Sequence, residues 1–183
     1  MRRALRIHPD GDRGPVTRIE AEIGRPGPGV LTLAYELTGE VGRLRIPPPA
    51  QPAAVDGLWQ RTCFEAFVGL ADGGYLEFNL SPSGRWAAYR FAGYRAQMTP
   101  LAELAPPVIR LTQGDAGLVL KAKLDLSVLP DVEARGAWPL GLSAVIEDAE
   151  GRKGYWALAH PPGKPDFHHA AGFACEVRPP EAA

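Results

Sequence analysis

The chain is poor in cysteine. It has 2 cysteines among 183 residues, and Cys63 and Cys175 lie far apart and form no CxxC pair. A chain of this length buries a core without disulfides or metals, and the sequence gives no sign of an oxidising compartment. We therefore expect two buried free thiols, neither of them catalytic.

Long apolar runs and an excess of one charge are also lacking. No stretch approaches the roughly 20 apolar residues of a membrane helix. No apolar stretch follows the basic residues near the N-terminus, so we expect no signal peptide and a cytoplasmic location. A net charge of −1 gives no basic footprint for nucleic acid. Neither a membrane nor a nucleic acid is expected as a partner.

Glycine and proline are plentiful, at 21 and 19 residues, and the segments between them alternate hydrophobic and polar side chains. The clearest segment, 117–126, places Leu118 and Leu120 on one face and Lys121 and Lys123 on the other. Such alternation is typical of half-buried strands. It predicts strands at 16–23, 31–38, 63–69, 75–80, 86–91, 109–113, 117–126, 140–147, 153–160 and 173–178.

Turn residues separate these strands, and few segments favour a helix. The turns at 70–74 and 81–84 predict hairpins between the strands that flank them. Only 99–104 and 126–129 are candidates for a helical turn. So many short strands predict an all-β fold, an antiparallel β-sandwich of the immunoglobulin-like or jelly-roll kind.

The sandwich is expected to be a single domain covering residues 15–178. An N-terminal arm (1–14) precedes it and a flexible tail (179–183) follows it. The proline-rich stretch 46–52 has too few amide donors for a strand and is interpreted as a loop along one edge.

Three polar side chains are expected to cluster on one surface. If 63–69 and 75–80 pair as a hairpin, Glu65, Glu77 and Asn79 share a face. Two nearby carboxylates repel each other unless a cation, a proton or a ligand relieves them. Arg61, Arg90, or Lys121 and Lys123 are candidates for that relief. The cluster is then either a solvated face or a polar floor for hydroxyl groups. A glycosidase pair would need a cleft that the sequence does not indicate.

Aromatic and histidine residues leave two further alternatives open. Trp59 and Trp86 lie at strand ends, where an indole either caps the core or stacks on a sugar ring. The segment 160–169 gathers three histidines and Asp166. It is a metal site, a loop that bonds its own backbone, or a lid or edge of the ligand site. Its spacing matches no zinc motif.

Five segments together resemble a known family. The sequences LWQRTCFEAF (58–67), YLEFNLSPSGRWAAY (75–89), GYR (93–95), YWALAH (155–160) and KPDFH (164–168) are similar to the bacterial DOMON-like proteins. That group is akin to type 9 carbohydrate-binding modules and is sometimes appended to a peptidoglycan-precursor reductase. The resemblance implies a β-sandwich with a ligand site for sugars or haem.

The resemblance also implies which residues bind the ligand. In type 9 modules, tryptophans grip a sugar while carboxylate or amide groups bond its hydroxyls. The positions carried over are Trp59, Glu65, Glu77, Asn79 and Trp86, with Arg61 and Arg90 as supporting candidates. Haem-binding relatives use axial Met and His or Lys, for which Met98, His160 and His168 are the residues available.

The sequence therefore predicts a non-catalytic module that binds a carbohydrate or sugar-like small molecule. It shows no recognisable nucleophile, phosphate loop or acid–base pair, so we expect no enzyme and no cofactor. Two alternatives stay open. One is a haem- or metal-binding DOMON-type domain, and the other is a structural domain that docks onto a protein through an exposed apolar patch.

Overall fold

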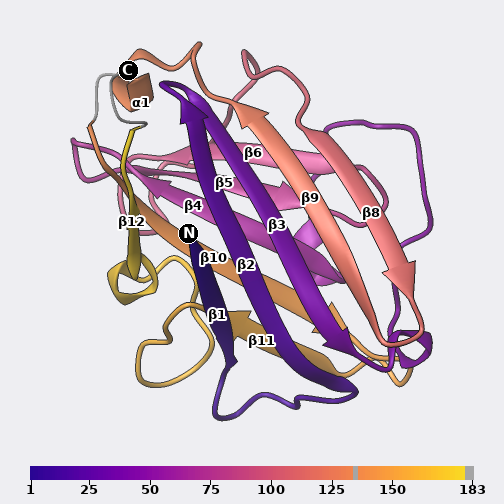
Figure 1. Cartoon of the computed structure of the whole chain (residues 1–183). Helices are drawn as coiled ribbons and strands as arrows, with labels where there is room; N and C mark the ends of the chain where they lie inside the picture. Colours follow the sequence, from indigo (N-terminus) through magenta and orange to yellow (C-terminus); the bar gives the residue numbers. More distant parts are fainter. Residues whose placement is uncertain (134–135, 180–183) are drawn as a thin grey trace.

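A computed structural model of the chain describes residues 1–133 and 136–179. Over these residues the strands form two packed layers (Figure 1). One layer has the order β1 (Arg2–Ile7), β2 (Val16–Gly27), β3 (Val30–Gly39), β9 (Gly117–Asp125) and β8 (Val108–Gly114). The other has the order β11 (Lys153–Ala157), β10 (Trp138–Glu147), β4 (Cys63–Gly69), β5 (Tyr75–Leu80), β6 (Trp86–Phe91) and β7 (Thr99–Pro100), and β12 (Cys175–Val177) also pairs with β10.

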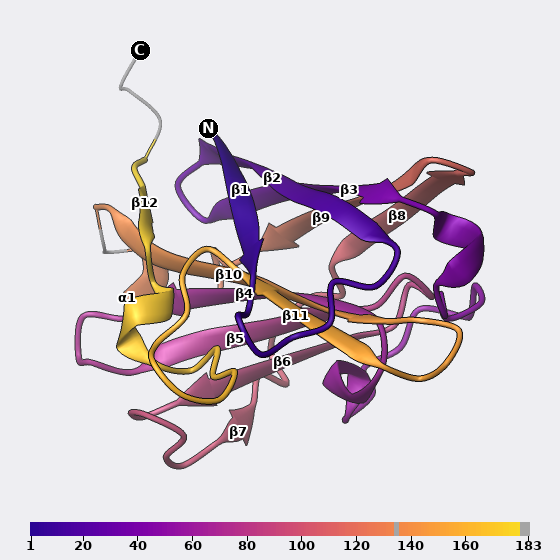
Figure 2. The same ribbon diagram turned by 90° about the horizontal axis from the view of Figure 1, so that it is seen from below.

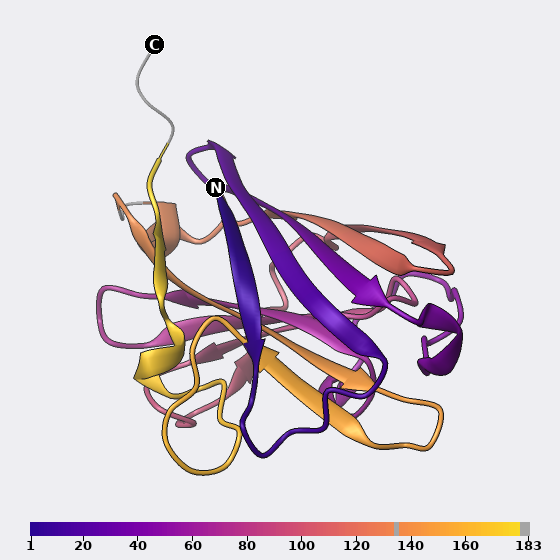
Figure 3. The same ribbon diagram turned by 60° about the horizontal axis from the view of Figure 1, so that its bottom comes forward.

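All pairs between these strands are antiparallel, and the predicted all-β sandwich is confirmed. Seen from below, the two layers lie one above the other (Figure 2). Strand β1 connects them, because it pairs with β2 at Leu5↔Ile19 and with β11 at Ile7↔Trp156. One curled sheet therefore makes both layers (Figure 3).

The core fills the space between the layers. Alternation along β4 and β5 turns Phe64, Phe78 and Leu80 inward, where they meet Ile19 and Tyr35 of the other layer. The Tyr35 hydroxyl donates a hydrogen bond of 2.6 Å to the carbonyl of residue 65. This bond satisfies the polar end of a ring that is fully buried. The inner faces are thus committed to packing, and only the outer faces are available for a ligand.

Several predicted elements differ in the structure. Residues 2–7, expected to belong to an arm, form β1. The expected turn at 99–104 is confirmed in part: Thr99 and Pro100 pair with β6 as β7, and the Leu104 N–H then donates to the Leu101 carbonyl at 3.3 Å. The expected turn at 126–129 is present, with the Leu129 N–H donating to the Leu126 carbonyl at 3.0 Å, and the short helix α1 (Pro130–Glu133) follows it. The hairpins at 70–74 and 81–84 are confirmed.

Short 3₁₀ turns and loops complete the fold. The turns are η1 (Val41–Arg43), η2 (Leu58–Gln60) and η3 (Ala170–Gly172). Both cysteines are free thiols, and Cys63 is buried whereas Cys175 is half-buried. Of the predicted tail only residue 179 belongs to the described residues, and 180–183 lie outside them. Within the described ranges, no helix is long and apolar enough to cross a membrane.

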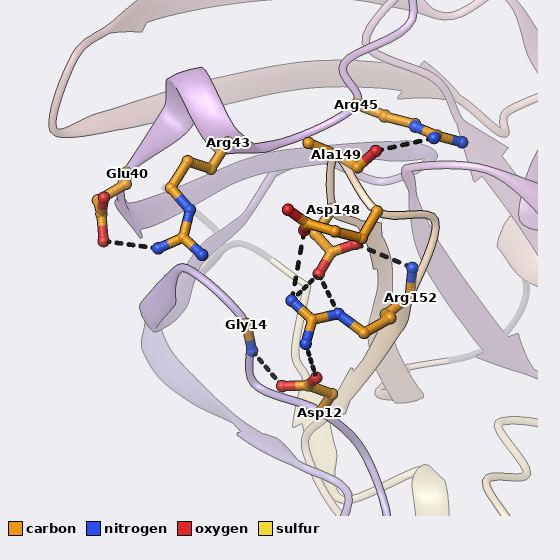
Figure 4. A network of polar contacts seen from close by, with 9 residues as sticks. Asp12, Gly14, Glu40, Arg43, Arg45, Asp148, Ala149 and Arg152 are labelled. Carbon is orange, nitrogen blue, oxygen red and sulfur yellow. Dashed lines mark hydrogen bonds and ion pairs between the residues drawn. The ribbon is translucent and has the colours of Figure 1, made fainter.

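One end of the sandwich is fastened by ion pairs (Figure 4). Asp148, in the turn between β10 and β11, accepts hydrogen bonds from the Arg152 Nε at 2.7 Å and from the backbone N–H of the same residue at 2.9 Å. Arg152 also pairs with Asp12 at 3.1 Å. Arg45 donates to the carbonyl of Ala149 at 2.8 Å. These contacts tie the segment before β2 and the loop after η1 to the same turn.

Candidate functional site

The outer face of β4, β5, β6 and β10 carries polar side chains that the other layer does not cover. In the register, Glu65 of β4 lies between Asn79 of β5 and Ser143 of β10. Glu77 of β5 lies between Phe67 of β4 and Tyr89 of β6. Since residues of one face alternate with those of the other, the strands that build the core also bring these polar groups together.

A cavity of about 890 Å³ lies over this face. Its floor is formed by the outward side chains of the strands, and its walls come from the segments around 56–60, 95–98, 153–155 and 165–168. The lining residues are Asp56, Gly57, Trp59, Gln60, Glu65, Glu77, Tyr89, Phe91, Arg95, Met98, Val145, Lys153, Tyr155, Pro165, Phe167 and His168. Four distant parts of the chain thus enclose one space.

Glu65 is the most deeply buried carboxylate in the cavity floor, at 3% exposure. Its Oε2 accepts a hydrogen bond of 3.0 Å from the Ser143 hydroxyl. Burial, and secondarily the charge of Glu77, raise its pKa to about 8. No lysine or arginine among the described residues pairs with it. Glu65 is therefore largely protonated at neutral pH and can both donate and accept a hydrogen bond.

Glu77 is the second floor carboxylate, at 5% exposure. Burial raises its pKa, and a hydrogen bond from Asn79 and the charge of Arg95 oppose that rise. The Asn79 Nδ2 donates to Glu77 Oε1 at 2.6 Å, which leaves Oε2 toward the cavity. Asn79 is itself fully buried and lies two residues further along the same face of β5, so its hydrogen bond fixes the position of Glu77.

A hydrogen-bond chain links the loop before η3 to this floor. The Tyr75 hydroxyl accepts a hydrogen bond from the backbone N–H of Arg95 at 3.2 Å and shares another with His168 Nδ1 at 2.7 Å. The His168 Nε2 lies 3.7 Å from Glu77 Oε2. Burial, followed by the charge of Arg95, lowers the pKa of His168 to about 4. The ring is neutral at neutral pH, with one N–H donor and one acceptor nitrogen.

The same loop is anchored by Asp166. Its carboxylate accepts hydrogen bonds from the Tyr94 hydroxyl at 2.6 Å and from Arg95 Nη2 at 2.8 Å. The loop between β11 and β12 contributes Pro165, Phe167 and His168 to the lining. It forms one wall of the cavity.

Aromatic rings make up much of the remaining wall. Trp59, on η2, is 51% exposed, and Tyr89 of β6 donates to Asp56 Oδ1 at 2.6 Å. Phe91 and Phe167 line the same space. Rings with open faces beside hydrogen-bonding groups are the usual components of a small-molecule site.

Of the residues predicted to bind a ligand, four lie at this cavity or directly beneath it. Trp59, Glu65 and Glu77 line it, and Asn79 holds Glu77. Arg61 does not line it. Its guanidinium points to Glu147, with Nη1 2.9 Å from Oε1.

Trp86 and Arg90 are also not brought to the cavity. In the register they stand opposite Leu80 and Leu76, which belong to the inner face. Trp86 is consequently 7% exposed and packs in the core. Arg90 pairs with Asp131 of α1 at 2.5 Å. Trp86 and Arg90 each lie two residues from Ala88, which belongs to the core, so their side chains leave β6 on the inner face.

The sequence left the segment 160–169 open as an edge of the ligand site, but it did not indicate which of its residues line the cavity. Alternation already put Tyr75 on the face of Glu77, and the same period places Tyr89 and Phe91 there. Nothing in the pattern connected Arg95 or His168 to them, because Arg95 meets Tyr75 across an irregular loop and His168 meets Tyr75 across 93 residues.

The residues at the cavity do not fit an axial haem pair. Met98 and His168 both line it, but the two His168 ring nitrogens face Tyr75 and Glu77. The His160 Nε2 is bonded to the carbonyl of Arg6 at 2.9 Å. Within residues 1–133 and 136–179, no group of three or more His, Cys, Asp or Glu could hold a metal ion.

Comparison with known proteins gives structural likeness only. No model of a known protein family matches the sequence, and no curated protein matches it. The resemblance to DOMON-like proteins therefore stays a prediction.

Solved structures do match the fold. A putative carbohydrate-binding protein from Bacteroides uniformis is 13% identical, with a TM-score of 0.65 over 94% of this chain and 83% of that one. A family 9 carbohydrate-binding module from Caldicellulosiruptor kristjanssonii in complex with cellotriose is 11% identical, with a TM-score of 0.61 over 100% of this chain and 84% of that one. A family 9 carbohydrate-binding module from the same organism in complex with glucose is 13% identical, with a TM-score of 0.52 over 91% of this chain and 78% of that one. The chain thus shares the β-sandwich fold of family 9 carbohydrate-binding modules.

Proposed function

We propose that the chain is a non-catalytic binding module for a carbohydrate or sugar-like small molecule, and that the cavity over β4, β5 and β6 is its site. The observation that carries the proposal is the pair Glu65 and Glu77, buried at the floor of an aromatic-walled cavity without a cationic partner among the described residues. Burying such groups costs free energy unless hydrogen bonds offset the cost, and ligand hydroxyls supply those bonds. The fold shared with modules that hold cellotriose and glucose also supports it.

The binding mode follows from the groups present. The exposed indole of Trp59 offers a flat face for the C–H groups of a pyranose. Glu77 Oε2 accepts a hydroxyl hydrogen, whereas protonated Glu65 donates or accepts, and His168 Nε2 donates or accepts according to the ring tautomer. A single site of this kind binds with a free energy of about −4 to −8 kcal/mol, from millimolar to micromolar Kd.

Isothermal titration with glucose, cellotriose and N-acetylglucosamine tests the proposal. We expect saturable binding of at least one sugar, weakened about tenfold or more in Glu77→Gln. Glu22→Gln, which removes an exposed carboxylate from the outer face of the other layer, is the matched control and should bind like the wild type. The proposal fails if no sugar produces heat, or if the two variants behave alike.

We further propose that this binding needs neither haem nor a metal ion. The hydrogen bonds of His168 Nδ1 to Tyr75 and of His160 Nε2 to the Arg6 carbonyl support this, since each occupies one ring nitrogen that a metal or haem iron would need. Titration after dialysis against a chelator should give an unchanged Kd, and added haemin should show no shifted Soret band. Loss of sugar binding on chelation, or a shifted band that Met98→Leu abolishes, would contradict it.

A further inference from the structure

We propose that the preferred ligand carries a protonated amino group, as an amino sugar with a free amine does, and is not a neutral hexose. This inference rests on the proposed function and specifies the ligand of the same cavity.

The charged residues that line the cavity differ in depth. Arg95 and Lys153 are the basic residues that line it, and Asp56, Glu65 and Glu77 are the acidic ones. Arg95 is paired with Asp166 at 2.8 Å and its side chain is half-exposed. The acids of the floor are almost fully buried. The carboxyl groups therefore lie deep in the cavity and Arg95 is paired with Asp166, which leaves Lys153 as the lining cation without an ion pair among the described residues.

Glu65 and Glu77 each use one carboxylate oxygen in a hydrogen bond within the protein. Ser143 occupies Oε2 of Glu65, and Asn79 occupies Oε1 of Glu77. At 3.7 Å, His168 Nε2 is too far from Glu77 Oε2 for a good hydrogen bond. One oxygen of each carboxylate is thus left for a ligand. An ammonium group has three N–H donors and no acceptor, so it can donate to both oxygens at once.

The aromatic wall of the cavity favours a cation independently of the carboxylates. Trp59, Tyr89, Phe91, Tyr155 and Phe167 line the same cavity. The negative faces of aromatic rings attract a cation, and most strongly when the cation is desolvated. Rings around a buried acidic floor accommodate an ammonium group better than the planar, neutral amide of an N-acetyl group.

A cation also relieves the mutual repulsion that a neutral ligand leaves in place. The negative charge of Glu77 disfavours ionisation of Glu65, and a neutral sugar brings no charge that relieves this repulsion. An ammonium between the two lets both ionise, and the proton of Glu65 passes to the solvent. The charge of the ligand then decides affinity as much as its hydroxyls do.

Titration of the full chain with glucosamine, glucose and N-acetylglucosamine tests the inference. At mildly acidic pH and low salt, where the amine is charged, we expect glucosamine to bind at least about tenfold more tightly than the other two sugars. Glu65→Gln and Glu77→Gln should each reduce that preference. Glu22→Gln, which changes the net charge equally without touching the cavity, should keep it.

The outcomes separate the inference from the proposed function. Equal affinity for the three sugars, or weaker binding of glucosamine, overturns the inference and leaves sugar binding in place. A preference that Glu22→Gln reduces as much as Glu77→Gln also overturns it, because net charge and not the cavity would then explain it. Absence of binding for all three sugars overturns both.

Discussion

Two regions of the molecule bury carboxylates, and they differ in what faces them. At the end of the sandwich, Glu147 meets Arg45 at 3.0 Å and Arg61 at 2.9 Å. The adjacent Asp148 is held by Arg152 (Figure 4). Each buried acid there has a cation that reaches it from the surface. Buried charges with such partners fasten loops together, so this region is structural.

The cavity floor has the opposite arrangement. Glu65 and Glu77 are as deeply buried, but their partners are the neutral groups of Ser143 and Asn79. Burial raises the pKa of both. Charge that is left uncompensated inside a cavity favours a ligand that compensates it. The contrast teaches that the partner of a buried acid, and not its burial, separates a structural role from a binding role.

The largest expected effect is on the pH dependence of stability. A carboxyl group whose pKa rises from 4.5 to about 8 on folding is stabilising only while protonated. Its contribution is complete below about pH 4.5 and is lost as pH rises to about 8, by up to about 1.4 kcal/mol per pH unit. Glu65→Gln stays neutral, so it should gain stability over the wild type across that window. Urea unfolding of both proteins between pH 5 and 9 measures the difference, and parallel curves would contradict the assignment.

The ion-paired region should respond in the opposite sense. Glu147→Gln removes the charge that faces two arginines, and we expect a loss of about 1 to 3 kcal/mol in the free energy of unfolding at neutral pH. Sugar affinity should not change, since Glu147 does not line the cavity. A variant that is as stable as the wild type would remove the contrast between the two regions.

Loss of the rim indole should affect binding and leave the fold intact. Trp59→Ala removes a half-exposed ring, so the melting temperature should change little, whereas sugar affinity should fall about tenfold, or about 1.4 kcal/mol. Val128→Ala, which truncates another exposed apolar side chain outside the cavity, is the control. Calorimetric titration and thermal melts of both variants separate the effects. Unchanged affinity in Trp59→Ala would exclude stacking on that ring.

The smallest effect is expected for Arg61. Its side chain is 66% exposed, and solvent screens such a pair, so Arg61→Ala should cost below about 1 kcal/mol. Sugar binding should stay within about twofold of the wild type. A loss of affinity as large as that of Trp59→Ala would place Arg61 in the binding site, as the family resemblance implied.

Local patterns were enough to predict the central hairpins. Strands β4, β5 and β6 have the bounds that alternation and tight turns predicted, because both signals act between near neighbours in the chain. The pattern of Arg2–Ile7 was too weak to predict a strand. Its two pairing partners, β2 and β11, are what make it one.

The site was predictable only as far as the face of a strand. The alternation of side chains places Glu65, Glu77 and Asn79 on one face. The same alternation turns Trp86 inward once the short turn at 81–84 sets the register of β5 and β6. The loop wall with His168 depends on contacts across more than 90 residues. No periodicity encodes contacts of that range, and they follow from tertiary packing alone.

The central claim, that the cavity beside Trp59 binds a sugar, is tested most directly by the indole N–H signals in an NMR titration. The chain has 4 tryptophans, and Trp59 is half-exposed whereas Trp86, Trp138 and Trp156 are buried. We assign the Trp59 signal by its loss in Trp59→Ala and add glucose, cellotriose and glucosamine in turn. The account predicts that at least one sugar shifts the Trp59 signal saturably and by more than the other three. Four signals that stay in place with every sugar, or a shift largest at a buried indole, would contradict it.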